Sequence, residues 1–166
     1  PENLCEQTDM LARAYSGGVP MGGDLPPADA NAVPRFVVHA SKDVGTQSFP
    51  GTDLQRVQII KGWVDQAGEA HTEIFDVAGD ANNGASVDLS SCQRQGRGAS
   101  SLCSVWQDPD FNASDKAYYY ARVVENPSCR WSQYICSINK VDCANPQTIT
   151  EGLENCCSAE HRPIIQ

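Results

Sequence analysis

Hydrophobic residues in this chain occur mainly in short runs with the two-residue alternation of β-strands. Turns rich in glycine, proline, asparagine and aspartate separate these runs. Runs of this kind, rich in β-branched and aromatic residues, predict strands. We expect strands at residues 35–41, 54–64, 71–78, 102–107, 117–125 and 131–138, with a shorter one at 86–89.

Helical periodicity is limited to residues 3–15 and to a short segment near 148–155. The second and third strands are joined by the glycine-containing turn 65–68, which predicts an antiparallel hairpin. The whole pattern favours an all-β fold, namely an antiparallel β-sandwich with long disulfide-stapled loops and one or two short helices. The strand at 117–125 is apolar on both faces, which is typical of a central strand.

The chain has 166 residues, which suits a single domain with its own core. Its formal net charge is -9, so no nucleic-acid partner is expected, because phosphate binding needs clustered lysine and arginine. No membrane insertion is expected, because no apolar run approaches the roughly 20 residues that span a bilayer. The chain opens with Pro1 and no initiator methionine, and we expect it to be an excerpt of a longer protein.

Eight cysteines are scattered along the chain, and their even number predicts disulfides formed in an oxidising compartment. Zinc binding is the alternative, but no Cys-x-x-Cys or Cys-x-x-His spacing occurs. Cys92 and Cys103 flank a short polar loop and are expected to pair with each other. The sequence leaves open the pairing of the other six, which are Cys5, Cys129, Cys136, Cys143, Cys156 and Cys157. The five of these that follow residue 128 are expected to tie down the C-terminal third.

Residues that could carry catalysis are few. The three histidines, His39, His71 and His161, are isolated from one another in the sequence, whereas a hydrolytic metal site needs several histidines and carboxylates that converge. No nucleophile motif occurs, and no cysteine lies near a histidine. This chain alone is therefore not expected to be catalytic.

Asp108, Asp110 and Asn112 have the alternate spacing of oxygen ligands in a calcium-binding turn. Pro109 stiffens this turn, and the glycine and glutamate of an EF-hand are missing. A weak calcium site is one interpretation, and an Asx-rich turn that joins two strands is the other. No other cofactor is expected in this chain.

The dense aromatic residues also have two interpretations. Most are expected in the core, because each buries about 150–250 Å². An exposed tryptophan or tyrosine on a β-sandwich could instead stack on a sugar ring. Arg122 lies inside an aromatic strand and needs a partner, for which a carboxylate is expected. Arg122 or Arg130 could otherwise present its guanidinium to a carboxylate or phosphate of a ligand.

Several blocks of this sequence resemble one known family, domain-of-unknown-function family 3604. The two blocks that carry most of the specificity are VWQDPDF and YYYARVVE, the second followed by CRWS. The matching blocks are spread over most of the chain in one order, at residues 18–25, 58–65, 105–111, 118–125 and 129–132.

The resemblance implies that full-length members are secreted or periplasmic bacterial proteins similar to PHP-type (polymerase and histidinol phosphatase) metal-dependent phosphoesterases. Their amino-terminal part is expected to be a distorted α/β barrel that holds divalent metals through histidine and aspartate. Residues 1–166 then form a single C-terminal accessory β-sandwich domain that follows the barrel.

On this interpretation, the chain packs against the missing barrel of the same protein, whose substrate the sequence does not reveal. We expect the contact, or a ligand contribution, at Met21, Asp24, Arg122, Arg130 and Trp131. The alternative is a stand-alone carbohydrate- or ligand-binding module that uses exposed aromatic residues. A third interpretation, an independent enzyme, would require tight zinc or manganese binding by this chain alone.

Overall fold

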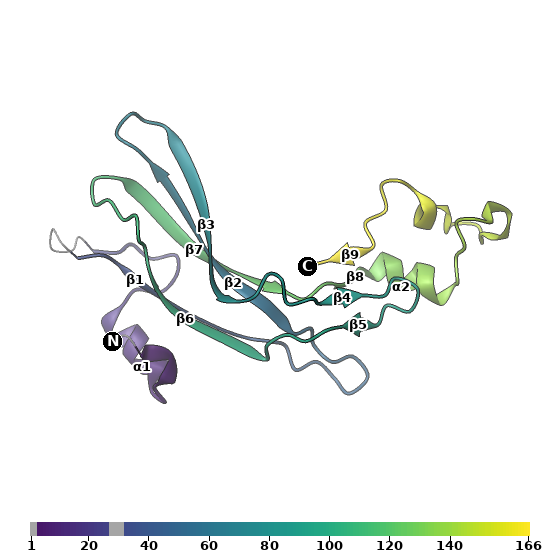
Figure 1. The fold of residues 1–166 in the computed structure, drawn as a ribbon, viewed down its shortest axis with the longest axis horizontal. Helices are drawn as coiled ribbons and strands as arrows, with labels where there is room; N and C mark the ends of the chain where they lie inside the picture. Colours follow the sequence, from purple (N-terminus) through teal and green to yellow (C-terminus); the bar gives the residue numbers. More distant parts are fainter. Residues whose placement is uncertain (1–2, 27–31) are drawn as a thin grey trace. The chain divides into compact units, whose positions relative to one another are not determined.

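The chain is built mostly from antiparallel strands, with two short α-helices (Figure 1). The computed structural model describes residues 3–26 and 32–166. In chain order the elements are η1 Leu4–Glu6, α1 Met10–Gly17, β1 Arg35–Ser41, β2 Leu54–Val64, β3 Ala70–Gly79, β4 Ser86–Val87, β5 Arg94–Gln95, β6 Ser101–Gln107, β7 Lys116–Glu125, β8 Ser128–Cys129, α2 Trp131–Ile138, η2 Pro146–Thr148, η3 Glu154–Cys157 and β9 Ile164–Ile165.

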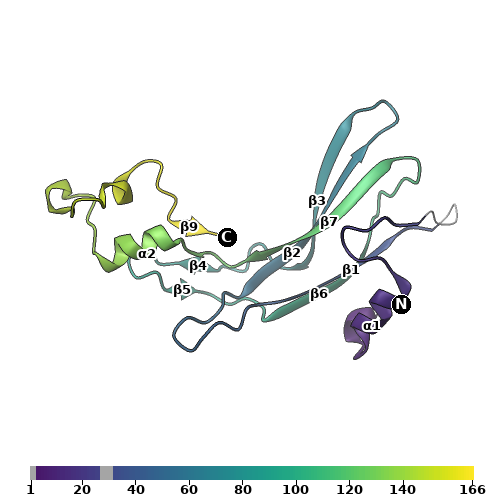
Figure 2. The same ribbon diagram turned by 180° about the vertical axis from the view of Figure 1, so that it is seen from behind.

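The chain divides into two compact units. The first comprises Pro1–Lys42, Leu54–Ala81 and Ala99–Val124. It contains a three-stranded sheet of order β3-β2-β7 and a two-stranded ribbon of β1 and β6. β2 and β3 form the predicted antiparallel hairpin, and β1 pairs with β6 along its full length (Figure 2).

The core of the first unit is centred on β2, the middle strand of the sheet. Val57, Ile59 and Ile60 on this strand are almost completely buried. Rings from the ribbon pack on the sheet: Phe36 of β1 lies 4.4 Å from Tyr119 of β7 between ring centroids. The ring of Trp106 on β6 likewise lies 4.8 Å from that of Phe75 on β3, so the two layers share an aromatic interior.

The second unit comprises Asp43–Asp53, Asn82–Gly98 and Glu125–Gln166. It contains the short pairs β4–β5 and β8–β9, helix α2 and the two 3-10 helices η2 and η3. Three disulfides cross-link it: Cys92–Cys129, Cys136–Cys156 and Cys143–Cys157. Of these, Cys92, Cys129 and Cys136 are buried. The short elements of this unit are therefore held chiefly by cross-links.

The predicted pairing of Cys92 with Cys103 is wrong. Cys103 bonds to Cys5, which anchors η1 to β6 in the first unit, and Cys92 bonds to Cys129 of β8 in the second. Disulfides form between Cα atoms closer than about 7 Å. Proximity in the sequence did not give that proximity in space, because β5 intervenes and Cys103 is fixed within β6 opposite His39.

The predicted strand at 131–138 is also wrong, because this segment is helix α2. Its apolar residues recur at helical spacing, at Trp131, Tyr134, Ile135 and Ile138. The density of aromatic and β-branched residues suggested a strand, whereas the period indicated a helix. β7 is likewise not a central strand: in the described part of the chain it pairs only with β2, at one edge of the sheet.

The predicted fold class is confirmed: the protein is mostly β with antiparallel sheets, two short α-helices and four disulfides. The predicted strands at 35–41 and 54–64 have the observed boundaries, and three further strands differ by a single residue at one or both ends. The expected helix near the N-terminus is present as η1 and α1.

Candidate functional site

A buried ion pair lies between the two layers of the first unit. Lys61 of β2 and Asp108, which directly follows β6, are only 3% and 2% exposed. The Lys61 Nζ lies 2.6 Å from Asp108 Oδ2 and donates a hydrogen bond of 2.9 Å to the Asp110 carbonyl. The Tyr119 hydroxyl of β7 donates to the same carboxylate at 2.6 Å, so three sequence blocks meet at one carboxylate.

The charges of Lys61 and Asp108 are compensated by each other and by neighbouring hydrogen-bonding groups. Burial alone would raise the pKa of Asp108, but hydrogen bonds from Lys61, Tyr119 and the Asp110 N–H outweigh it and hold that pKa below its ordinary value. Burial and the hydrogen bond to Asp108 raise the pKa of Tyr119 well above its ordinary value. The Lys61 ammonium also lies 4.9 Å from the ring centroid of Trp63, which adds a cation–π contact.

The predicted calcium ligands are engaged with separate protein partners. Asp108 binds Lys61, and its Oδ1 accepts the Asp110 N–H at 2.9 Å. Asn112 accepts the Ser114 N–H and donates to Asp115, as expected for an Asx-rich turn. In residues 3–26 and 32–166 no group of three or more His, Cys, Asp or Glu side chains could hold a metal ion. Calcium binding stays a prediction for which this geometry offers no support.

The outer face of the β3-β2-β7 sheet carries a second group of side chains. The Arg122 Nε of β7 donates to Gln58 Oε1 at 2.8 Å, and Gln58 Nε2 donates to Asp76 Oδ1 of β3 at 2.6 Å. The partner of Arg122 is therefore an amide rather than the expected carboxylate. Beside this network, the rings of Tyr118 and Tyr120 are exposed and 10° from parallel.

Helix α2 of the second unit exposes its hydrophobic side. Trp131 is 76% exposed and Ile138 is 77% exposed, and Tyr134 and Ile135 on the same stripe are also exposed. The opposite side of the helix faces the protein through polar groups: Gln133 donates to the Leu89 carbonyl at 2.8 Å. This arrangement is the reverse of an ordinary surface helix, whose apolar side faces the core.

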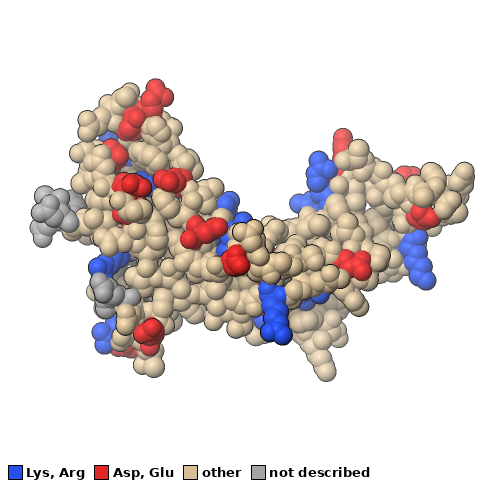
Figure 3. Space-filling view, in the orientation of Figure 1, with Lys and Arg blue, Asp and Glu red and all other residues tan. Residues whose placement is uncertain are grey.

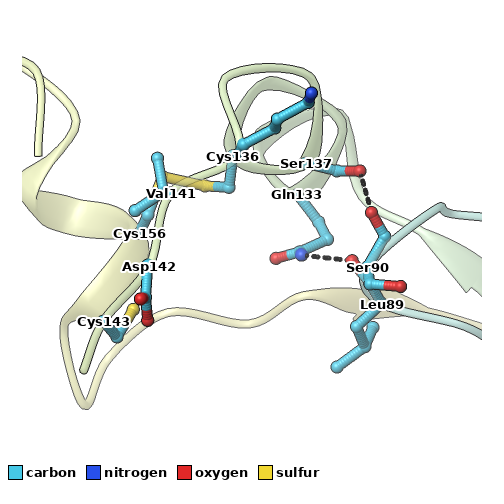
Figure 4. A pocket seen from close by; sticks show the side chains of 10 residues that line it. Leu89, Ser90, Gln133, Cys136, Ser137, Val141, Asp142, Cys143 and Cys156 are labelled. Atoms are coloured by element: carbon cyan, nitrogen blue, oxygen red, sulfur yellow. Dashed lines mark hydrogen bonds between the residues drawn. A yellow bond between two sulfur atoms is a disulfide. The ribbon is translucent and has the colours of Figure 1, made fainter. Parts of the chain in front are cut away.

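A pocket of about 420 Å³ lies beside this polar side of α2 (Figure 4). The Cys136–Cys156 disulfide borders it, together with Ser137, Lys140 and Asp142. Its polar groups are largely occupied within the protein: Ser137 Oγ donates to the Ser90 carbonyl, and the Asp142 carboxylate accepts from the Ala144 and Asn145 nitrogens. The lining does not indicate a particular ligand.

Sequence patterns gave no indication of one further exposed side chain, Phe49. It lies in the loop of residues 43–53 and is 80% exposed. The loop is ordered by hydrogen bonds, because the Arg94 guanidinium donates to Thr52 Oγ1 at 2.8 Å and to the Pro50 carbonyl at 2.7 Å. Gly45, at φ 63°, pairs with Pro50 across the loop, where a Cβ would meet backbone atoms. A lone phenylalanine between turn residues has no periodicity that could reveal it.

The other predicted contact residues are exposed as well. Met21 and Asp24 follow α1 in the first unit, and Arg130 immediately precedes α2 in the second. The histidines are not brought together. His71 Nε2 lies 2.8 Å from Asp65 and its ring stacks on Trp63, whereas His161 contacts Gln133.

Fold and sites define a β-rich, disulfide-bonded module, and four disulfides indicate an oxidising, extracytoplasmic environment. The chain belongs to the family described as "Protein of unknown function (DUF3604)", whose profile matches residues 1–152. No curated protein and no solved structure matches the chain. None of the helices within residues 3–26 and 32–166 has the length and hydrophobicity that a membrane span requires.

Proposed function

We propose that this chain is the C-terminal accessory domain of an exported, PHP-like metal-dependent hydrolase, and that it packs against the catalytic barrel through the apolar stripe of α2. The main support for this proposal is that α2 exposes its apolar side to solvent instead of packing it on the core. Apolar residues scattered over a surface need no explanation, but a stripe with four of them at helical spacing is the pattern by which helices dock in grooves of partner proteins.

The barrel is proposed as the partner because the family resemblance implies that a barrel precedes this domain in the same protein. In that arrangement the barrel would hold the divalent metals and perform the hydrolysis, and this domain would cover part of the barrel. The four disulfides support an exported protein, secreted or periplasmic, since such bonds persist in oxidising compartments.

Two further exposed side chains support a docking role. Met21 and Phe49 lie on segments ordered by hydrogen bonds, such as that from the Gly23 N–H to the Pro20 carbonyl. Large apolar side chains on ordered segments are typical anchors of protein interfaces, because the backbone that carries them is already fixed and loses little conformational entropy on binding.

The test is a pull-down of the separately produced barrel half of a family member by this chain. We expect wild-type chain to retain the barrel and the double variant Trp131→Ala/Ile138→Ala to lose it, since truncation of interface anchors costs about 2 kcal/mol or more. Tyr15→Ala is the matched control, because Tyr15 is an exposed aromatic residue on the other α-helix.

Two results would contradict the proposal. One is the absence of any association between the wild-type chain and the barrel at micromolar concentration. The other is self-association of the wild-type chain, detected by light scattering and abolished in the double variant, because the stripe would then be an interface between two copies.

A further inference from the structure

The outer face of the β3-β2-β7 sheet exposes aromatic side chains of β7, whereas Ile60 and Gln58 of β2 on the same face are buried. Tyr118 is 59% exposed and Tyr120 is 43% exposed. Contacts of Gly62 with Tyr118 and of Gln58 with Arg122 show that β7 runs antiparallel to β2. Because residues directly opposite one another share a face, the sheet presents three successive rows on this side.

The first two rows form an aromatic platform. Tyr118 reaches across Gly62, where an added Cβ would lie 2.3 Å from its Cζ atom, so the absence of a side chain on β2 makes room for the ring. Tyr120 lies on the next row beside Ile60 and Ile74. The two ring centroids are 6.3 Å apart and the ring planes nearly parallel.

The third row is polar and planar. It consists of Asp76, Gln58 and Arg122, joined by the hydrogen bonds of 2.6 and 2.8 Å described above. Within residues 3–26 and 32–166 the side-chain hydrogen bond of Arg122 uses only its Nε atom, and Arg122 is exposed, so its two Nη groups are left as donors for a ligand. The Tyr118 and Tyr120 hydroxyls likewise make no hydrogen bond within residues 3–26 and 32–166.

The aromatic platform and the polar row together suit a sugar, which has apolar ring faces and a hydroxyl-bearing edge. A pyranose ring presents C–H groups on its faces, and these are attracted to the negative face of an aromatic ring. Its edge presents neighbouring hydroxyls, which planar groups such as guanidinium and carboxylate can bind with two hydrogen bonds at once.

We propose that this sheet face binds an uncharged polysaccharide, with successive sugar units on Tyr120 and Tyr118 and the hydroxyls of a neighbouring unit on the exposed groups of Arg122 and Asp76, which the buried Gln58 holds in place. The charge of the chain selects against an anionic glycan, because the net charge is -9. Figure 3 shows acidic side chains over the β2–β3 hairpin of the same sheet. The inference concerns a different surface from α2 and does not depend on the barrel.

The experiment is native affinity electrophoresis of this chain in gels that contain one soluble polysaccharide each. The uncharged probes are laminarin, hydroxyethyl cellulose and dextran, and alginate is the anionic probe. We expect retardation by at least one uncharged probe and none by alginate. Tyr120→Ala is expected to weaken binding about tenfold, the effect of losing one aromatic contact.

Variants separate loss of the site from loss of folding. Tyr118→Ala uncovers Gly62, so Tyr118→Phe is measured beside it and is expected to bind, because it keeps the ring. Arg122→Lys removes the planar donor fork and is expected to weaken binding, whereas Tyr15→Ala is expected to bind like wild type. The inference is overturned if no uncharged probe retards the chain, if alginate alone does, or if Tyr120→Ala and Arg122→Lys migrate like wild type.

Discussion

At the scale of single residues, Lys61 shows what a buried charge requires. Its ammonium is compensated by Asp108, by the Asp110 carbonyl and by the ring of Trp63. Removing one member of a buried pair is far more damaging than exchanging both, because the remaining charge is left without a partner. The cluster therefore brings together Lys61, Asp108 and Tyr119, which lie in three sequence blocks far apart in the chain.

Lys61→Met is expected to lower the free energy of unfolding by about 3–5 kcal/mol, because the Asp108 carboxylate would be left unpaired. The double variant Lys61→Met/Asp108→Asn is expected to be less destabilised than Lys61→Met alone, since no buried charge remains. Urea unfolding monitored by tryptophan fluorescence measures both. Lys116→Ala, at an exposed position, is the control and should change stability by no more than about 0.5 kcal/mol. Equal effects of the single and double variants would contradict this account.

The same cluster predicts acid lability. The pKa of Asp108 is lower in the folded protein than its ordinary value of 3.8, so the ionised form contributes stability above that pH. This contribution is lost as the pH falls below 3.8 and the carboxylate becomes protonated. We expect the stability difference between wild type and Asp108→Asn to shrink over that range, measured by urea unfolding at several pH values. The exposed variant Asp24→Asn is the control. A difference that stays constant down to pH 2 would exclude the explanation.

At the scale of elements, the sequence predicted strands β1 and β2 correctly but predicted a strand where helix α2 lies. β1 and β2 have their predicted boundaries, because β-branched runs bounded by turn residues leave few alternatives. The segment Trp131–Ile138 is short and apolar, and a segment of this kind is compatible with a strand and with a helix. In the structure α2 buries Cys136 and leaves the apolar stripe outside, whereas a strand would bury alternate residues.

At the scale of the whole molecule, the two units are stabilised by different means. The buried aliphatic residues Leu54, Val57, Ile59 and Ile60 all belong to the first unit, together with Leu4. The second unit contains three of the four disulfides and little buried aliphatic surface. Small modules that cannot build a sufficient core commonly depend on such cross-links.

Reduction of the disulfides is therefore expected to unfold the second unit first. After treatment with a phosphine reductant, amide hydrogen exchange should become fast in α2 and at β8 while the amides of Val57 to Ile60 keep their protection. Loss of Cys5–Cys103 lowers the stability of the first unit by about 2–5 kcal/mol without removing its core. The non-reduced protein is the control, and simultaneous loss of protection in both units would contradict the prediction.

The sequence by itself determined the class of fold, the strands of the first unit, the oxidising environment and the family. Fold class and strands follow from local periodicity and turn residues, the environment from the cysteine number, and the family resemblance from specific sequence blocks such as VWQDPDF. Only the tertiary structure decided the cysteine partners, the burial of Asp108 against Lys61 and the outward stripe of α2. Each of these depends on which distant segments come within a few ångströms, and spacing along the chain does not specify that distance.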